Sequence, residues 1–111
     1  MAGPGLSVYR EPALSNTAKA AKTTEGKVYS MHVENSNATK SYVHFYDVAA
    51  GSVTVGTTVP MRTMFVPATG GMDFAWTVPL DFDTAISCAA TTTATGGTAP
   101  VAGLLVNVDY T

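Results

Sequence analysis

Two histidines are the residues of this chain best suited to do chemistry. His32 and His44 could act as acid–base groups or as metal ligands, and each lies in a stretch of alternating apolar and polar residues. We therefore expect them on neighbouring strands, where they could lie side by side. A metal site needs a third ligand and a nucleophile needs a base beside it, and no spacing in the sequence supplies either. Structural roles fit both histidines better, and we expect no enzyme activity and no cofactor.

Three aspartates form a second candidate site. Asp81 and Asp83 would share one face of a strand, and with Asp73 they could offer oxygen ligands to Ca²⁺. No loop like that of an EF-hand accompanies them, and acids between apolar residues usually face solvent. We expect solvated side chains, with a calcium site as the alternative.

Three other motifs have structural interpretations. Asn37 begins an N-glycosylation sequon, which without a signal peptide we interpret as coincidence. Gly70 and Gly71 predict a hairpin turn and not a phosphate loop, since no Lys-Ser/Thr pair follows them. Cys88 is the only cysteine, which excludes an intramolecular disulfide, and its apolar neighbours predict a small buried side chain.

The composition limits the class of protein. A chain of 111 residues is the size of one domain, and 46% of it is hydrophobic. Charged residues make up 13%, against about 25% in an average soluble protein, and this favours packing against other protein. A net charge of −2 argues against nucleic-acid binding. No apolar run reaches the length of a membrane span, so we expect a soluble protein made in a reducing cytoplasm.

Short strands must position these side chains. Alternation and turn residues predict strands over 27–34, 41–48, 53–55, 59–66, 73–83, 84–90 and 104–110, with 73–83 bent into two at Pro79. Tyr29 is expected on the same face as Met31 and Val33, and Phe74 and Trp76 are expected in the core or in a subunit interface. No helix is expected. The pattern predicts an all-β chain whose residues 27–111 form a small antiparallel β-sandwich or jelly-roll-like domain.

Residues 1–26 predict an extended N-terminal arm. Gly3, Pro4 and Pro12 interrupt it, and it has no apolar period. Its three bases exceed its two acids by one, whereas residues 27–111 hold three bases and six acids. Leu6, Val8 and Tyr9 could add an edge strand to this chain's own sheet or to that of a neighbour. We expect the arm to lie across a neighbouring subunit or the shell on which the subunits assemble, anchored by Leu6, Val8 and Tyr9, with Arg10, Lys19 and Lys22 as steering charges.

Three segments are similar to a group of small virion proteins of tailed bacteriophages. They are SYVHFYD at 41–47, TVGTTVPMRTMFVPATGG at 54–71 and VAGLLVNVDY at 101–110. That group shares an aromatic strand ending in Tyr-Asn or Tyr-Asp, a "vGTt-P" turn, a strand closing on Val-Pro-Ala-Gly and a terminal strand ending in Tyr. The resemblance covers about residue 27 to the end. Thr69 interrupts the third feature, and the run from Trp76 to Pro79 departs from the Gly-rich segment usual there.

The resemblance implies a non-enzymatic virion structural protein, most simply a capsid decoration (cement) protein on the outside of a phage shell. Its partners would be the major capsid protein and copies of itself, in a trimer or other small oligomer, without nucleic acid or membrane. The residues expected at such interfaces are Leu6, Val8, Tyr9, Arg10, Tyr42, Tyr46, Met64 and Trp76. The alternatives are a tail- or fibre-associated adhesion module and a carbohydrate-binding module that uses Tyr42, Tyr46 and Trp76.

Overall fold

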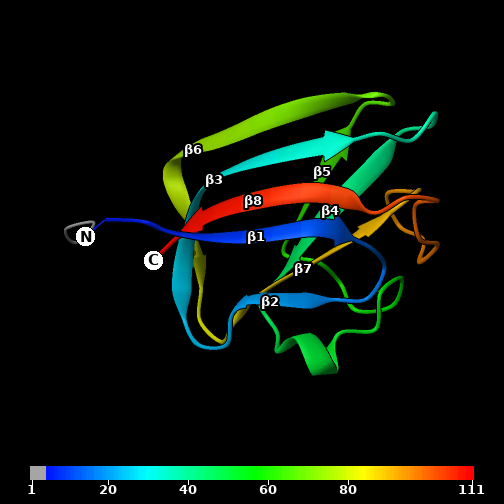
Figure 1. Ribbon diagram of the computed structural model, residues 1–111. Coiled ribbons are helices and arrows are strands. Elements are labelled where there is room, and N and C mark those ends of the chain that lie inside the picture. Colours follow the sequence, from blue (N-terminus) through cyan, green and yellow to red (C-terminus); the bar gives the residue numbers. More distant parts are fainter. Residues whose placement is uncertain (1–4) are drawn as a thin grey trace.

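Alternating apolar side chains produce eight strands, which pack as two sheets face to face (Figure 1). The structure, a computed structural model, describes residues 5–111. The strands are β1 (Ser7–Leu14), β2 (Lys19–Lys22), β3 (Gly26–Asn35), β4 (Ser41–Tyr46), β5 (Arg62–Val66), β6 (Gly70–Phe82), β7 (Ile86–Thr91) and β8 (Leu104–Tyr110). One 3₁₀ turn, η1 (Ala50–Ser52), lies in the connection between β4 and β5.

The strand order is that of a jelly roll. Sheet A has the order β1-β8-β3-β6 and sheet B the order β2-β7-β4-β5, with every neighbouring pair antiparallel. β1 therefore pairs with β8, β2 with β7, β3 with β6 and β4 with β5, as in one long hairpin wound into two sheets. The prediction of a small all-β sandwich is confirmed, and the topology selects the jelly-roll arrangement.

The core lies between the inner faces of the two sheets. Phe45 packs edge-on against Phe82, with ring centroids 5.9 Å apart, and Cys88 is fully buried beside them. Burial raises the pKa of the Cys88 thiol to about 12, so it behaves as an unreactive hydrophobic side chain, as predicted. The other fully buried apolar side chains include Leu14, Val28, Val33, Val43, Val66, Ile86, Ala90, Leu104, Val106 and Val108.

The N-terminal segment belongs to the sandwich, which corrects the prediction of a separate arm over 1–26. Residues 7–22 form edge strands of this chain's own sheets: Ser7 pairs with Tyr110 and Lys19 pairs with Cys88. Leu14 anchors the segment because it is completely buried in the core. The sequence left open whether Leu6, Val8 and Tyr9 would add an edge strand to this chain's own sheet or to that of a neighbour. In the structure β1 pairs with β8 of the same chain. Residues 1–4, which include the first part of the expected arm, lie outside the described residues.

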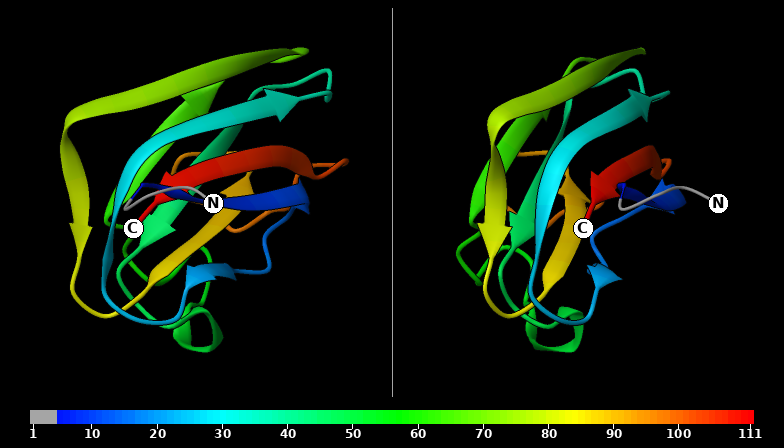
Figure 2. Two further views of the ribbon diagram at one scale, coloured as in Figure 1. Left: turned by 60° about the vertical axis from the view of Figure 1, so that its left-hand side comes forward. Right: turned by 90° about the vertical axis from the view of Figure 1, so that its left-hand side faces the viewer.

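Two β-bulges change the predicted strand faces. In β3, Val28 pairs with Tyr110 and Ser30 pairs with Asp109, so Tyr29 between them is an extra, unpaired residue. Val28 therefore occupies the core position that was expected for Tyr29. In β6, pairing with β3 is interrupted between Ala75 and Leu80. The expected bend is therefore present inside one strand and not between two, and Figure 2 shows it clearly.

Two further predictions are corrected near prolines and glycines. Residues 53–55 form no strand and lead into a turn over 55–57, where the Thr54 carbonyl accepts from the N–H groups of Thr57 and Thr58. β5 starts after Pro60. The turn before Gly70 is not a hairpin, because β5 is in sheet B and β6 is in sheet A. Thr69 has a φ of 47° there, and its N–H and hydroxyl both donate to the Asn37 carbonyl.

Candidate functional site

The two histidines lie on opposite outer faces of the sandwich. His32 is on β3 in sheet A and His44 on β4 in sheet B, because the connection between these strands crosses from one sheet to the other. The expectation that they are neighbours is wrong. Within residues 5–111, no three His, Cys, Asp or Glu side chains are grouped so that they could hold a metal ion, Asp73, Asp81 and Asp83 included.

His32 is a partly exposed group between two carboxylates. Its Nδ1 lies 2.7 Å from Asp73 Oδ1 and its Nε2 lies 2.9 Å from Glu34 Oε2. The hydrogen bond with Glu34, followed by that with Asp73, raises the pKa of His32 above its ordinary value. All three side chains are solvated, with Asp73 85% exposed, so the cluster contributes less than about 1 kcal/mol to stability.

His44 is a buried group with a hydroxyl beside each ring nitrogen. Its Nδ1 lies 2.8 Å from Thr63 Oγ1, and its Nε2 lies 2.7 Å from Thr91 Oγ1. The Thr91 hydroxyl donates its proton to the Thr93 carbonyl at 2.6 Å, so it accepts from His44 Nε2–H. Nδ1 is then the acceptor for the Thr63 hydroxyl. Burial lowers the pKa of His44, which fits this neutral tautomer.

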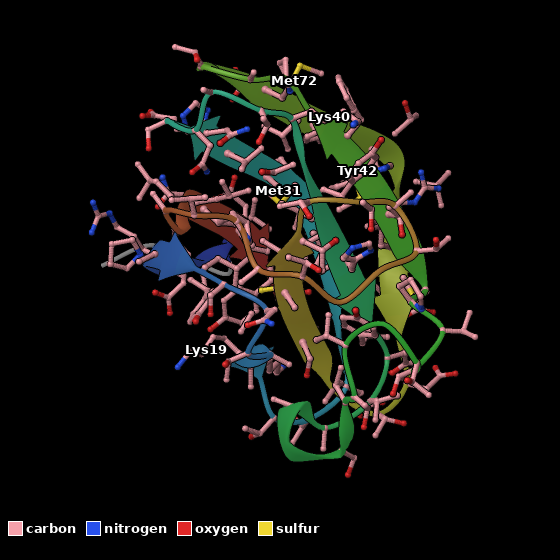
Figure 3. All side chains as sticks on the ribbon, turned by 90° about the vertical axis from the view of Figure 1, so that its right-hand side faces the viewer. Lys19, Met31, Lys40, Tyr42 and Met72 are labelled. Carbon is pink, nitrogen blue, oxygen red and sulfur yellow. The ribbon has the colours of Figure 1, made fainter. Side chains whose placement is uncertain are left out.

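A cavity of about 300 Å³ lies over His44 and Tyr46 on the outer face of sheet B. Two loops border this open hollow: the β4–β5 connection, through Gly56, Thr57, Thr58, Val59 and Pro60, and the β7–β8 connection, through Ala94, Thr95 and Gly96. Figure 3 looks onto this side of the molecule and shows the β7–β8 connection passing in front of the strands of sheet B, with the β4–β5 connection at their lower end. Sequence alternation placed His44 and Tyr46 on one face of a strand but did not reveal the loops that cover them.

Polar contacts hold these loops in place. The Asn16 side-chain amide donates to the Gly97 carbonyl at 2.9 Å, and the Thr92 N–H donates to the Thr98 carbonyl at 3.0 Å. Gly97 packs so closely on the other loop that a Cβ there would lie 2.7 Å from the Val55 carbonyl oxygen. The cavity is therefore formed by two loops in direct contact.

The Asp47 side chain fixes the turn between β6 and β7. Asp47 accepts from the N–H groups of Asp83, Thr84 and Ala85 at 3.0, 2.8 and 3.4 Å. Burial by itself would raise the pKa of Asp47, but these three donors together lower it.

The sequon residue Asn37 has a structural role. Its Nδ2 donates to Asn35 Oδ1 and to the Ala102 carbonyl, both at 2.8 Å, and its Oδ1 accepts from the Ala102 N–H. The side chain is buried, with 8% of the residue exposed. It joins the β3–β4 turn to the β7–β8 connection, and its amide nitrogen is already bonded.

The fold places the residues predicted at interfaces in different environments, some buried and some exposed. Met64 is in the core and Tyr46 is under the loops, so neither offers surface to a partner. Tyr42 packs edge-on against Phe65, 5.7 Å away, on the outer face of sheet B, whereas Trp76 stacks on Phe74 at the edge of sheet A. The predicted sugar site of Tyr42, Tyr46 and Trp76 is therefore not assembled. At the N-terminus, Leu6, Val8 and Arg10 are exposed, and Tyr9 packs against the core with its hydroxyl bonded to Glu11.

An apolar edge runs along β6, the outermost strand of sheet A. We define the β6 edge as Met72, Phe74, Trp76 and Val78. Met72 is 36% and Val78 78% exposed, and the two aromatic rings are half-buried against the core, as predicted for Phe74 and Trp76. The Arg62 guanidinium of β5 lies over the Trp76 ring, 5.9 Å from its centroid, where the two sheets are open to each other.

Comparison with known proteins finds similarity among solved structures but not among families or curated sequences. No family model matches the chain, and no curated protein matches it. Among solved structures, a chain of the "Cyanophage Pam1 capsid asymmetric unit" is 19% identical, with 99% of this chain and 88% of that chain covered and a TM-score of 0.33. In residues 5–111 no helix has the length and apolar character of a membrane span.

Proposed function

We propose that the protein is a non-enzymatic virion structural component, and specifically a decoration protein on the outside of a phage capsid. The observation that carries this proposal is the β6 edge, an apolar strand that no other described strand covers. The resemblance of residues 41–47, 54–71 and 101–110 to small phage virion proteins supports it. So does the jelly-roll topology, which viral capsid proteins use repeatedly, although many unrelated proteins share that fold.

The two sides of the sandwich differ in how their edges are protected. At the β1–β2 side, β2 has only four residues and begins and ends with a lysine, Lys19 and Lys22. Pro12 interrupts β1, and both strands carry bulges. These features are how natural proteins prevent edge-to-edge pairing. At the β6 edge, a strand of 13 residues instead exposes Met72 and Val78. We infer that the β6 edge is a contact surface.

A second copy of this chain and the capsid protein are the proposed partners of the β6 edge. Full burial of a Val or Met side chain contributes about 1.5–3 kcal/mol, so two such side chains beside two aromatic rings form a substantial contact. The interruption of pairing between Ala75 and Leu80, with Pro79 inside it, prevents a continuous added strand along β6. Side-chain packing in a closed oligomer of a few copies fits this shape better than an open-ended sheet.

Self-association is tested with two valines that are both exposed. Light scattering at micromolar concentration should show an oligomer for the wild type and a monomer for Val78→Asp, because a carboxylate in the contact would be desolvated without a partner. Val101→Asp is the matched control, since Val101 is 100% exposed on the β7–β8 connection. It should leave the oligomer unchanged. A wild-type protein that is monomeric, or a Val78→Asp oligomer, would contradict the role of the β6 edge.

The location in the particle is tested by copy number. Quantitative mass spectrometry of purified virions should find hundreds of copies per particle if the protein decorates the shell. A handful of copies would instead indicate the alternative, a tail- or fibre-associated module. Absence from the purified particle would remove the virion proposal altogether.

A further inference from the structure

The two sheets are open to each other along one side of the sandwich. β5 is the edge strand of sheet B and β6 that of sheet A, and the contact between Arg62 and Trp76 joins them. Figure 2 shows both strands on the same side of the molecule. We propose that this side binds an extended strand of another protein, which pairs with the free edge of β5 and places a carboxylate beside Arg62. Such a strand would come from the capsid protein, so the assignment of its source rests on the proposed function.

β5 offers a free edge of the right length for one short strand. It pairs with β4 on one side, and no described strand pairs with its other side. Every second residue of such an edge directs its N–H and C=O groups away from the sheet, where an added strand can bond them. Pro60 and Pro67 bound β5, so the added pairing is limited to its five residues and does not extend into an open-ended sheet. β6 is the poorer template, because its own pairing is interrupted between Ala75 and Leu80.

Arg62 determines the charge of the added strand. It is exposed, its guanidinium lies 5.9 Å from the centroid of the Trp76 ring, and no carboxylate of residues 5–111 forms an ion pair with it. An added strand would remove water from this guanidinium, and a charge that loses its water needs a counter-charge. An Asp or Glu opposite Arg62 would supply it. Arg and Trp are also the residue types that most often dominate the binding energy of an interface.

The inner face of β5 determines the apolar positions of the added strand. Arg62, Met64 and Val66 alternate along β5, with Met64 5% exposed and Val66 fully buried. Phe74 and Trp76 of β6 are partly buried against the same core. Side chains directly opposite in neighbouring strands share a face, so apolar residues are needed opposite Met64 and Val66. All neighbouring strands of the sandwich are antiparallel, and an added strand of that direction reads apolar-x-apolar-x-Asp/Glu.

No free strand of this chain has that sequence, which is why the partner is another protein. The only match is the run 43–47, whose two apolar side chains are fully buried and whose carboxylate already holds the turn between β6 and β7. The exposed side chains of β1 and the residue before it, Leu6 and Val8, do alternate. They continue into Arg10, however, which has the same charge as Arg62 and would repel it.

The experiment is a titration of the full chain with two synthetic peptides, followed by amide NMR spectra. The first peptide is Thr-Val-Thr-Val-Thr-Glu-Thr, blocked at both ends, and the second has Lys in place of Glu. The Glu peptide should shift the amides of β5 and the Trp76 indole signal saturably, with a dissociation constant below about 1 mM. The amides of β2, at the opposite edge of the same sheet, should not move. The Lys peptide should bind about tenfold more weakly or worse.

A charge swap tests the role of Arg62 directly. Arg62→Glu should reverse the preference, so that the Lys peptide binds better than the Glu peptide by about tenfold. Arg62→Gln, which serves if the first variant does not fold, should bind the two peptides equally. Lys19→Glu is the matched control, because it makes the same charge change on the exposed surface of β2, and it should leave both affinities unchanged.

Each of three results would overturn the proposal: no saturable binding of the Glu peptide, shifts confined to β6 without β5, or a peptide preference that the Arg62 substitutions leave unchanged. If Arg62→Glu dissociates an oligomer of the chain as Val78→Asp should, the occupant is a second copy and the proposal is also wrong. The peptide titrations need no virus particle, so their failure leaves the proposed virion role untouched. Absence of the protein from purified virions would instead remove the capsid protein as the source and leave the strand site standing.

Discussion

The outer faces of the two sheets carry one histidine each, and the pKa values of the two imidazoles are shifted in opposite directions. On sheet A, His32 lies in the open between Glu34 and Asp73, and its pKa is raised by both hydrogen bonds. On sheet B, His44 lies beneath two loops between Thr63 and Thr91, and burial lowers its pKa. The residue type and the alternating pattern are the same in both places. Burial beneath the loops lowers the pKa of His44, whereas two carboxylate partners raise that of His32.

The outer faces of the two sheets also differ in how far they are open to water. Sheet A presents charged and polar side chains directly to water, whereas the part of the outer face of sheet B around His44 and Tyr46 lies beneath the β4–β5 and β7–β8 connections. A roofed face can bury polar groups only if each finds a partner, and the hydroxyl–imidazole–hydroxyl chain at His44 meets that requirement. We therefore expect substitutions and pH changes to affect the two histidines unequally and, for pH, in opposite directions.

The largest effect should come from truncation of the buried histidine. His44→Ala removes two hydrogen bonds and leaves a void under the loops, so the free energy of unfolding should fall by about 2–4 kcal/mol. Urea denaturation followed by circular dichroism measures this change. A loss below about 1 kcal/mol would show that the roof over sheet B does not stabilise the fold.

An intermediate effect should appear on acidification. Because the pKa of His44 is lowered in the folded state, the unfolded chain binds more protons, and stability should fall as pH drops below about 6.5 and level off below the folded pKa. Unfolding measured between pH 5 and pH 8 (about 1.5 units either side of that value) should show this acid loss in the wild type. The loss should be absent in His44→Gln, and its persistence there would assign it to other groups.

The smallest effect should come from the exposed histidine. The folded-state pKa of His32 is raised, so its contribution is complete below about pH 6.5 and is lost as pH rises through that raised value. His32→Gln should lower stability by less than about 1 kcal/mol at pH 6 and leave it unchanged at pH 8.5. The same urea titrations measure it, and salt should weaken the effect. A larger loss at the higher pH would contradict an electrostatic origin.

Local pattern in the sequence determined the class of the fold and much of the core. A strand alternates its side chains between two faces, so Val43 and Phe45 of β4 and Val106 and Val108 of β8 could be assigned to the interior from their spacing alone. Cys88 could be placed in the core for a similar reason, since it lies in an apolar run. The apolar side chains of the β6 edge were likewise visible as an alternation, although their exposure was not.

Only the tertiary structure decided what lies beside what. β1 and β2 hold few apolar residues, and they are strands because β8 and β7 supply their hydrogen-bond partners from the far end of the chain. His32 and His44 are separated because the chain changes sheets between them. Tyr46, expected on the surface, is buried because loops distant in sequence meet above it. Strand alternation is a property of neighbouring residues, whereas sheet order and loop coverage depend on contacts between residues far apart, which a local pattern does not encode.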